Sequence, residues 1–351
     1  MESLDASARR AFLGESQVAS SVPLRVPTSD RSVLGSRPVT GAIEIDVLVE
    51  EIADLQPLPP IAAQVLQLAE GETFSAHELA QAISSDPALT ARVLRVANSA
   101  YYGFPRRITT IRDAVVLLGF RQIRSTLIAT SVMRSMPSYE GIDAAAFWRH
   151  SVTVGLLAEF GARIEGVHQD EAFTAGVLHN VGRLALDQAR PREFLRAREH
   201  ARDLRVSVHE AERALLGFTD AEVGEALARH WHFPTDLTAA IAHHADAPAS
   251  IPPGAGLARL VARARAFAAA AGITDGVDAA PGCSSRAVSP FAATVAVMNP
   301  DDLAAPSATR SPLVAPDPMQ DALDRLVAEQ GGLETVLDRA AAFVEHTAAA
   351  P

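Results

Sequence analysis

Histidines at three separate places in the sequence are candidates for metal binding or acid-base chemistry. His150 stands in line with Val154 at helical spacing, which turns it toward a core. His179 lies in a run of small and apolar residues, and His243 and His244 occupy a third inward-facing position. One histidine on an apolar face is commonly a core residue, whereas three on separate helices can share a pocket. Both interpretations stay open.

A second candidate site is basic and aromatic. Between Asp86 and Ser135 the chain has eight arginines and two aspartates, a formal charge of +6, although the whole chain carries −11. Aromatic residues and arginine are enriched at interface hot spots. The segment therefore predicts a surface for a partner protein, with six candidate residues: Tyr101, Tyr102, Arg106, Arg107, Arg121 and Arg124.

Other interpretations of this segment remain. The tyrosines follow Asn98 at the end of a predicted helix, where polar groups satisfy the last carbonyls and rings pack between bundles. The arginines can equally form a solvated face. Arg121 and Arg124, three residues apart on one helix, also permit a helix-turn-helix-like DNA contact. An acidic chain without a second clear basic recognition helix makes nucleic acid an unlikely partner.

Helix signals recur along the elements that must position these residues. Asp86 and Pro87 supply an N-cap and a first-turn proline. Thr110 and Asp113 resemble a capping box, and Gly119 is predicted to be a left-handed C-terminal residue. Glycines at 176 and 182, on either side of His179, permit close approach of helices. Without strand-like alternation, the predicted fold class is all-α.

Composition divides the chain into five parts. We predict a disordered tail over 1–40, an N-terminal helical bundle over 41–137, a second bundle over 138–272, a flexible Pro- and Ala-rich linker over 273–318, and a C-terminal helix over 319–347. No uninterrupted apolar run reaches the roughly 18 residues of a membrane span, and no secretory signal is visible. The single Cys283 cannot form an internal disulfide, so a cytoplasmic location is predicted.

The histidine pattern resembles the HD superfamily, helical metal phosphohydrolases that include the HD-GYP cyclic di-GMP phosphodiesterases. In active relatives a histidine, an adjacent His-Asp pair, further histidines and a late aspartate hold divalent metals, which turn a bound water into a nucleophile. The resemblance places His150 at the first histidine and His179 at the histidine of the pair.

Three positions depart from the pattern of the active relatives. The partner of His179 is Asn180, whose neutral amide oxygen cannot balance a metal's charge as a carboxylate does. Asp220 stands where the superfamily usually has histidine, and Arg265 falls near the expected late aspartate. The resemblance therefore implies a vestigial site at His150, His179, Asn180, Asp220, His243, His244 and Arg265, without a bound metal.

Fragments on both sides of this site are similar to the HDOD family. They are Leu58-Pro59-Pro60, Ser85 to Thr90, Leu94 to Gly103, Ala114 to Phe120, Trp231 to Pro234 and His243-His244. Their order and spacing extend the resemblance over about residues 48–270. It implies a non-catalytic relative of the HD fold, used in bacterial signalling beside receiver, cyclic di-GMP or kinase modules.

Three functions are compatible with these observations. The leading hypothesis is a signalling adaptor that binds a partner protein or small ligand, without catalysis, cofactor or membrane contact. The first rival is a metal-dependent phosphohydrolase that uses His150, His179, His243 and His244 with Asp220 as an unusual further ligand. The second rival is a nucleic-acid-binding regulator that uses the +6 segment.

Overall fold

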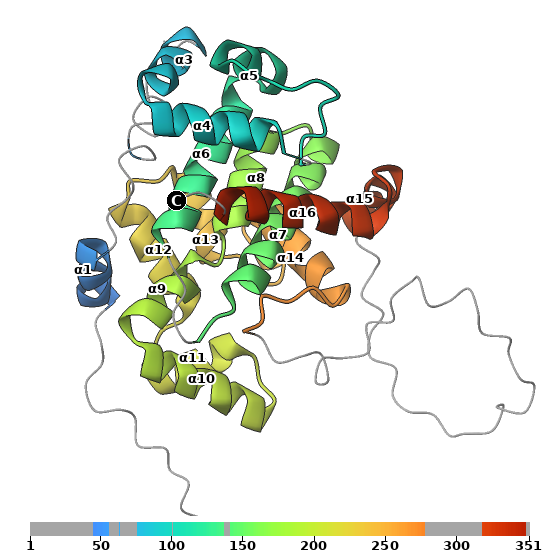
Figure 1. The fold of residues 1–351 in the computed structure, drawn as a ribbon. Helices are drawn as coiled ribbons and strands as arrows, with labels where there is room; N and C mark the ends of the chain where they lie inside the picture. Colours follow the sequence, from blue (N-terminus) through green and yellow to red (C-terminus); the bar gives the residue numbers. More distant parts are fainter. Residues whose placement is uncertain are drawn as a thin grey trace, which may run out of the picture. The chain divides into compact units, whose positions relative to one another are not determined.

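The part of the chain that the structure describes is built from helices. The computed structural model describes residues 45–55, 63, 76–99, 101–136, 141–277 and 318–348. Over these ranges the regular structure is helical and no strand occurs (Figure 1). The all-α prediction is confirmed. The predicted tail over 1–40 and residues 278–317 of the predicted linker lie outside the described ranges.

Two of the first helices along the chain begin at the predicted caps. The first helices are α1 (Ile45–Leu55), α3 (Ala76–Ser85), α4 (Pro87–Ala97), α5 (Ile111–Leu118) and α6 (Phe120–Ser135). The Asp86 carboxylate accepts from Leu89 N at 3.1 Å at the start of α4. Thr110 Oγ1 accepts from Asp113 N at 3.0 Å at the start of α5. Both side chains satisfy N–H groups that have no partner within the helix.

Gly119 joins α5 to α6 in a conformation that differs from the prediction. Its φ of 83° is positive, but its ψ of 153° lies outside the left-handed helical region. Glycine tolerates this geometry because it has no Cβ. Helix α6 starts at the next residue, at a bend of 108° from α5. Among the described helices none alone is long and apolar enough for a membrane span; α5 and α6 pass that test only as this bent pair.

The helices of the second bundle are α7 (Ala144–Glu165), α8 (Gln169–Leu178), α9 (Val181–Ala189), α10 (Pro191–Leu204), α11 (Val208–Leu216), α12 (Asp220–His230), α13 (Thr235–Ala242) and α14 (Gly256–Ala270). In this bundle the long helix α7 packs against two others, α8 and α14. A Cβ on Gly176 would lie 2.5 Å from Gly155 Cα, so α7 and α8 meet almost backbone to backbone. The predicted close approach at Gly176 is confirmed.

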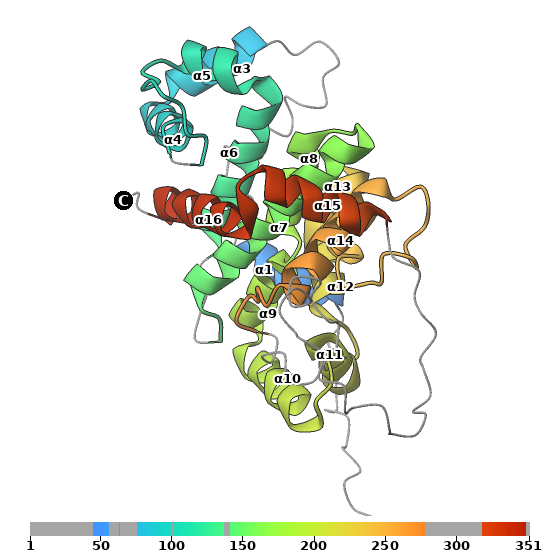
Figure 2. The same cartoon turned by 90° about the vertical axis from the view of Figure 1, so that its right-hand side faces the viewer.

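The C-terminal segment is two helices, and the prediction of one helix over 319–347 is wrong. Helix α15 (Pro318–Glu329) and α16 (Gly332–Ala348) are separated at Gly331 and Gly332, whose φ values are 94° and 87°. Both helices pack on α7, and α16 also contacts α4 and α6 (Figure 2). Helix α1, which the sequence assigned to the N-terminal bundle, contacts α9 and α12 of the second bundle.

Candidate functional site

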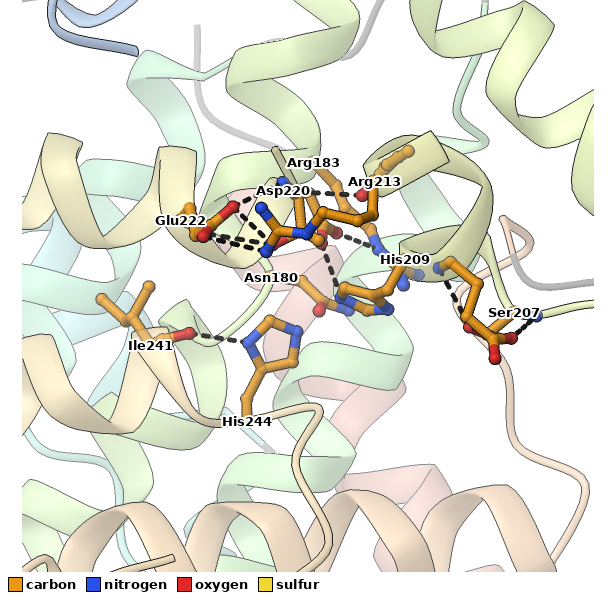
Figure 3. Close-up of polar contacts among 12 residues, drawn as sticks. Asn180, Arg183, Ser207, His209, Arg213, Asp220, Glu222, Ile241 and His244 are labelled. Atoms are coloured by element: carbon orange, nitrogen blue, oxygen red, sulfur yellow. Dashed lines mark hydrogen bonds and ion pairs between the residues drawn. The ribbon is translucent and has the colours of Figure 1, made fainter. Parts of the chain in front are cut away.

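A fully buried arginine forms the centre of the site. The side chain of Arg183, on α9, has an exposed fraction of 0%. Its Nε donates to Asp220 Oδ2 at 2.5 Å (Figure 3). Its Nη1 donates to Asp275 Oδ2. Asp220 begins α12, and Asp275 follows α14. Because a buried charge must be paired, this guanidinium joins three segments that are distant in sequence.

A glycine brings these segments together. A Cβ on Gly182 would lie 1.9 Å from Asp220 O, so only glycine allows α9 to approach the start of α12 this closely. The prediction for Gly182 is confirmed. The start of α12 is held by a capping box in which Thr219 N donates to Glu222 Oε2 at 2.9 Å. The close approach at Gly182 and the capping box therefore both place Asp220 beside Arg183.

Asp275 completes the ion-pair network. Asn180 Nδ2 donates to Asp275 Oδ2 at 3.1 Å, and Val277 N donates to Asp275 Oδ1 at 3.0 Å. Burial raises the pKa of Asp275, but the attraction of Arg183, together with smaller contributions from His150 and the Val277 N–H, outweighs that effect and lowers the pKa to about 2. The sequence placed residues 273–277 in a flexible linker. That prediction is wrong for Asp275 and Val277, which are buried against the site.

Four histidine rings form a row beside the ion pairs. The ring centroids of His150 and His179 are 5.5 Å apart, those of His179 and His244 are 5.1 Å apart, and those of His244 and His209 are 5.6 Å apart. His179 Nδ1 donates to Gly176 O at 2.6 Å, and His244 Nδ1 donates to Ile241 O at 2.7 Å. These bonds leave the lone pair on Nε2 of both rings.

Burial keeps the two central histidines neutral. Desolvation, followed by the nearby charges of His244 and His150, lowers the pKa of His179 well below its ordinary value. Desolvation, followed by the charge of Arg265, lowers the pKa of His244 to about 3. Among the described residues, neither Nε2 has a hydrogen-bond partner. The site thus offers two neutral imidazole acceptors in a buried setting.

The described residues contain one group with the spacing of a metal site. Ligand atoms of His209, Asp220 and His244 all lie within 4.8 Å of one another, and His209 Nε2 is 2.6 Å from Asp220 Oδ1. Imidazole and carboxylate are common metal ligands. One oxygen of Asp220 is already engaged, however, because Oδ2 accepts from Arg183 Nε, which leaves only Oδ1, beside His209, for an ion.

The pair of metals that the HD fold implies does not fit these residues. Asn180 replaces a carboxylate, and both nearby aspartates bind the guanidinium of Arg183. The charge of Arg265 also lowers the pKa values of His179 and His244, which means that a positive charge already acts on the centre. At most one ion fits, at the group of His209, Asp220 and His244.

The structure brings most of the predicted site residues together. His150, His179, Asn180, Asp220 and His244 are buried around one centre. Arg265 acts on it through its charge. His243 does not belong: its side chain is 41% exposed and its Nδ1 lies 2.8 Å from Asp246 Oδ2. The inward prediction for His243 is wrong because α13 ends at Ala242, and the turn that follows directs only His244 inward.

Four residues of the site were missed by the sequence prediction: Arg183, His209, Glu212 and Asp275. Arg183 had a usable signal, since it lies three residues after Asn180 and four after His179, the spacing of one helix face. His209 lies within the Ser207–Glu210 capping box, which marks a helix start but not a site. Nothing local distinguishes Asp275 from a linker residue.

The predicted partner surface is partly internal. Tyr101 is buried, with ring centroids 5.7 Å from Phe173 and 5.1 Å from Phe343 on α16. Tyr102 Oη shares a hydrogen bond with Thr126 Oγ1 at 2.9 Å, and burial raises the pKa of Tyr102 to about 12. The tyrosines therefore cannot offer the exposed surface predicted, because α16 covers Tyr101.

The four arginines of that surface have different surroundings. Arg124 lies 3.7 Å from carboxylates of both Asp170 and Glu171. Arg121, on α6, contacts the ring of His168, which is the N-cap residue of α8. Arg106 and Arg107 are exposed in the segment before α5.

Changing Arg106 and Arg107 together to glutamate is expected to leave the fold intact. Exposed substitutions usually shift the free energy of unfolding by less than about 0.5 kcal/mol each. We also expect weak binding of the wild-type protein to random duplex DNA, with a shallow salt dependence, because few phosphates would be neutralised. Urea unfolding and fluorescence anisotropy measure the two effects. Tight binding that falls steeply with salt would instead support a nucleic-acid-binding regulator.

The described residues define a class of protein: a helical fold that gathers histidine, asparagine and aspartate side chains around one buried centre. Residues 55–247 match the model of the HDOD domain. The "putative phosphohydrolase" of Shewanella amazonensis SB2B is 34% identical, with a TM-score of 0.56 and coverage of 63% of this chain and 80% of that one. The HDOD domain protein of unknown function from Geobacter sulfurreducens is 22% identical, with a TM-score of 0.65 and coverage of 86% and 97%.

Two further proteins are similar to this chain. The "putative signal transduction protein" of Marinobacter aquaeolei VT8 is 23% identical, with a TM-score of 0.58 and coverage of 84% of this chain and 61% of that one. An uncharacterized protein of Treponema pallidum (strain Nichols) is 24% identical over 203 residues, and the match spans 39% of its length. The chain belongs to the HDOD family, whose fold is HD-like.

Proposed function

We propose that this chain is a cytoplasmic signalling module that binds a partner protein or small ligand and does not hydrolyse phosphoesters. The observation that carries the proposal is the buried guanidinium of Arg183 between Asp220 and Asp275. Arginine remains protonated at every ordinary pH. The centre thus contains a permanent cation of its own, in contact with the carboxylates that a metal would need.

The signalling part of the proposal is supported by family membership and by the name of the Marinobacter structure. The absence of catalysis is supported by the chemistry of the centre. Asn180 cannot supply the missing negative charge, and Arg265 adds positive charge. A hydrolytic metal needs anionic ligands that hold it and orient a water.

A metal-dependent phosphohydrolase is the second candidate. One observation favours it: the ligand atoms of His209, Asp220 and His244 lie close enough together to hold one ion. The Shewanella amazonensis neighbour carries a phosphohydrolase name. Binding of an ion there would require Asp220 to serve Arg183 and the ion at once.

The purified protein is expected to contain well under one metal ion per chain. We also expect no hydrolysis of cyclic di-GMP, nucleotides or generic phosphodiesters with added manganese, iron or magnesium. Asn180→Asp alone should increase metal binding only slightly, because Arg183 stays in place. Elemental analysis and product chromatography measure both quantities.

His179→Ala is the control for this prediction. If the site is not catalytic, the variant loses stability but has no turnover to lose. Metal-dependent turnover in the wild type that disappears in a folded His179→Ala protein would contradict the proposal and favour the phosphohydrolase. Capture of partners from the native cell then tests the binding role.

A further inference from the structure

A large cavity opens beside the buried centre. Its volume is about 1510 Å³, and its walls come from the turn between α10 and α11, the start of α12, the end of α13 and residues 274–277. The basic residues that line it are Arg198, Arg202, Arg205, His209, Arg213, His243 and Arg265. His209 links this cavity to the centre, since its Nε2 lies 2.6 Å from Asp220 Oδ1 (Figure 3).

The carboxylates of the lining are engaged within the protein. Glu210 accepts from Ser207 N at 2.8 Å, and Glu222 pairs with Arg213 at 2.9 Å. Asp246 lies 2.8 Å from His243 Nδ1, and Glu225 forms an ion pair with Arg229. In contrast, Arg202 and Arg205 are exposed, and their side chains make no hydrogen bond or ion pair with any described residue. Their donor groups are available to a ligand.

Two features of this wall reduce the stability of the protein unless an anion binds there. Arg198 and Arg202 lie one helical turn apart on α10, and the charge of Arg202 adds to burial in lowering the pKa of Arg198. Like charges at this spacing repel. Arg205 adopts a left-handed conformation with φ of 58° at the end of α10, where glycine is the usual residue. A bound anion would offset the repulsion between Arg198 and Arg202. A contact with the anion would also explain why position 205 is an arginine and not a glycine.

The side of the cavity that faces the centre is also positive. Arg265 lines the cavity, and its charge lowers the pKa values of His179 and His244. Guanidinium groups bind phosphate through paired N–H donors of matching geometry. Apolar side chains in the same lining, including Val206, Val208 and Val277, can contact an organic group.

We propose that this cavity binds a phosphorylated small molecule through Arg202, Arg205 and Arg265, without a metal ion. The inference rests on the proposed function and names the ligand class of the same site. The shared chemistry is a phosphate or pyrophosphate group, and the volume of the cavity leaves room for an organic moiety attached to it.

The test is isothermal titration calorimetry of the full-length protein with sodium pyrophosphate and, separately, with ADP, in a buffer that contains EDTA. Both ligands should bind at one site per chain and more weakly as sodium chloride increases. Arg202→Gln and Arg205→Gly should each weaken binding at least about tenfold, the loss of one charge-assisted contact. Arg196→Gln, an exposed arginine on α10 outside the lining, should bind as the wild type does.

Arg205→Gly separates a binding role from a structural one. Glycine suits a φ of 58°, so this variant should melt at or above the wild-type temperature while it loses affinity. ADP binding that equals or exceeds pyrophosphate binding supports the phosphorylated class. No binding at millimolar concentration, equal binding by all variants, or binding that requires a divalent metal would overturn the inference. Absent binding without turnover leaves the proposed function in place, whereas metal-dependent hydrolysis of either ligand contradicts that function.

Discussion

Arg183→Met is expected to lower the free energy of unfolding by about 3–5 kcal/mol at pH 7, the cost of removing one partner from a buried ion pair. Asp220 and Asp275 would remain buried, each 1% exposed, without their shared cation. Arg183→Lys should lose less, because an ammonium keeps the charge but cannot reach both carboxylates as a fork. Urea unfolding followed by circular dichroism measures the differences.

The matched control is Arg192→Met, an exposed arginine on α10, which should change stability little. Adding Asp275→Asn to Arg183→Met should recover part of the loss, because one unpaired charge is removed. A Met variant as stable as the wild type would show that the buried network does not stabilise the fold, and it would also remove the main support for the proposed function.

The pH dependence of the stability of Arg183→Met follows from the protonation of the carboxylates that Arg183 binds. In the wild type the pKa of Asp275 is about 2, below its ordinary value of 3.8. Its contribution to stability is therefore present above about pH 4 and lost as the pH falls toward 2. In the Met variant the largest attraction that lowers the pKa of Asp275 is gone, so its pKa rises and protonation relieves the unpaired charge. The stability difference between the two proteins should shrink as the pH falls.

The second large effect is acid destabilisation by the buried histidines. The pKa of His244 is about 3 in the folded protein against an ordinary value of 6.5, so the unfolded chain binds a proton first. Stability is full above about pH 6.5 and falls as the pH decreases to 3. A shift of this size corresponds to about 5 kcal/mol. His244→Gln should flatten this dependence, as measured by urea unfolding between pH 7 and pH 4.

His179 has a lowered pKa of the same origin, so His244→Gln should remove only part of the acid sensitivity. His230→Gln is the control, since His230 is exposed at the end of α12. If the stability curves of wild type and His244→Gln run parallel across this range, His244 is not buried in a neutral form, and the description of the centre is wrong.

Local sequence signals predicted the helices well. Side chains such as Asp86 and Thr110 cap helices through N–H groups a few residues away, so their effect can be seen in a short window. The same holds for Gly176 and Gly182, where the absence of a Cβ marks close packing before the neighbour is known. His150, His179, Asn180 and Asp220 were placed at one site by resemblance, and the structure brings them together.

The all-α class and helix starts such as those of α4 and α5 could be predicted from the sequence because periodicity and capping act within a short window, and the family resemblance predicted most of the histidine site. The pairing of Arg183 with Asp275 could not, since the two residues are 92 positions apart and the attraction between them leaves no pattern in the sequence. The tertiary structure also decided that His244 and not His243 turns inward, and that α16 covers Tyr101. These outcomes depend on which surfaces pack together, because a charge that becomes buried must be paired with an opposite charge.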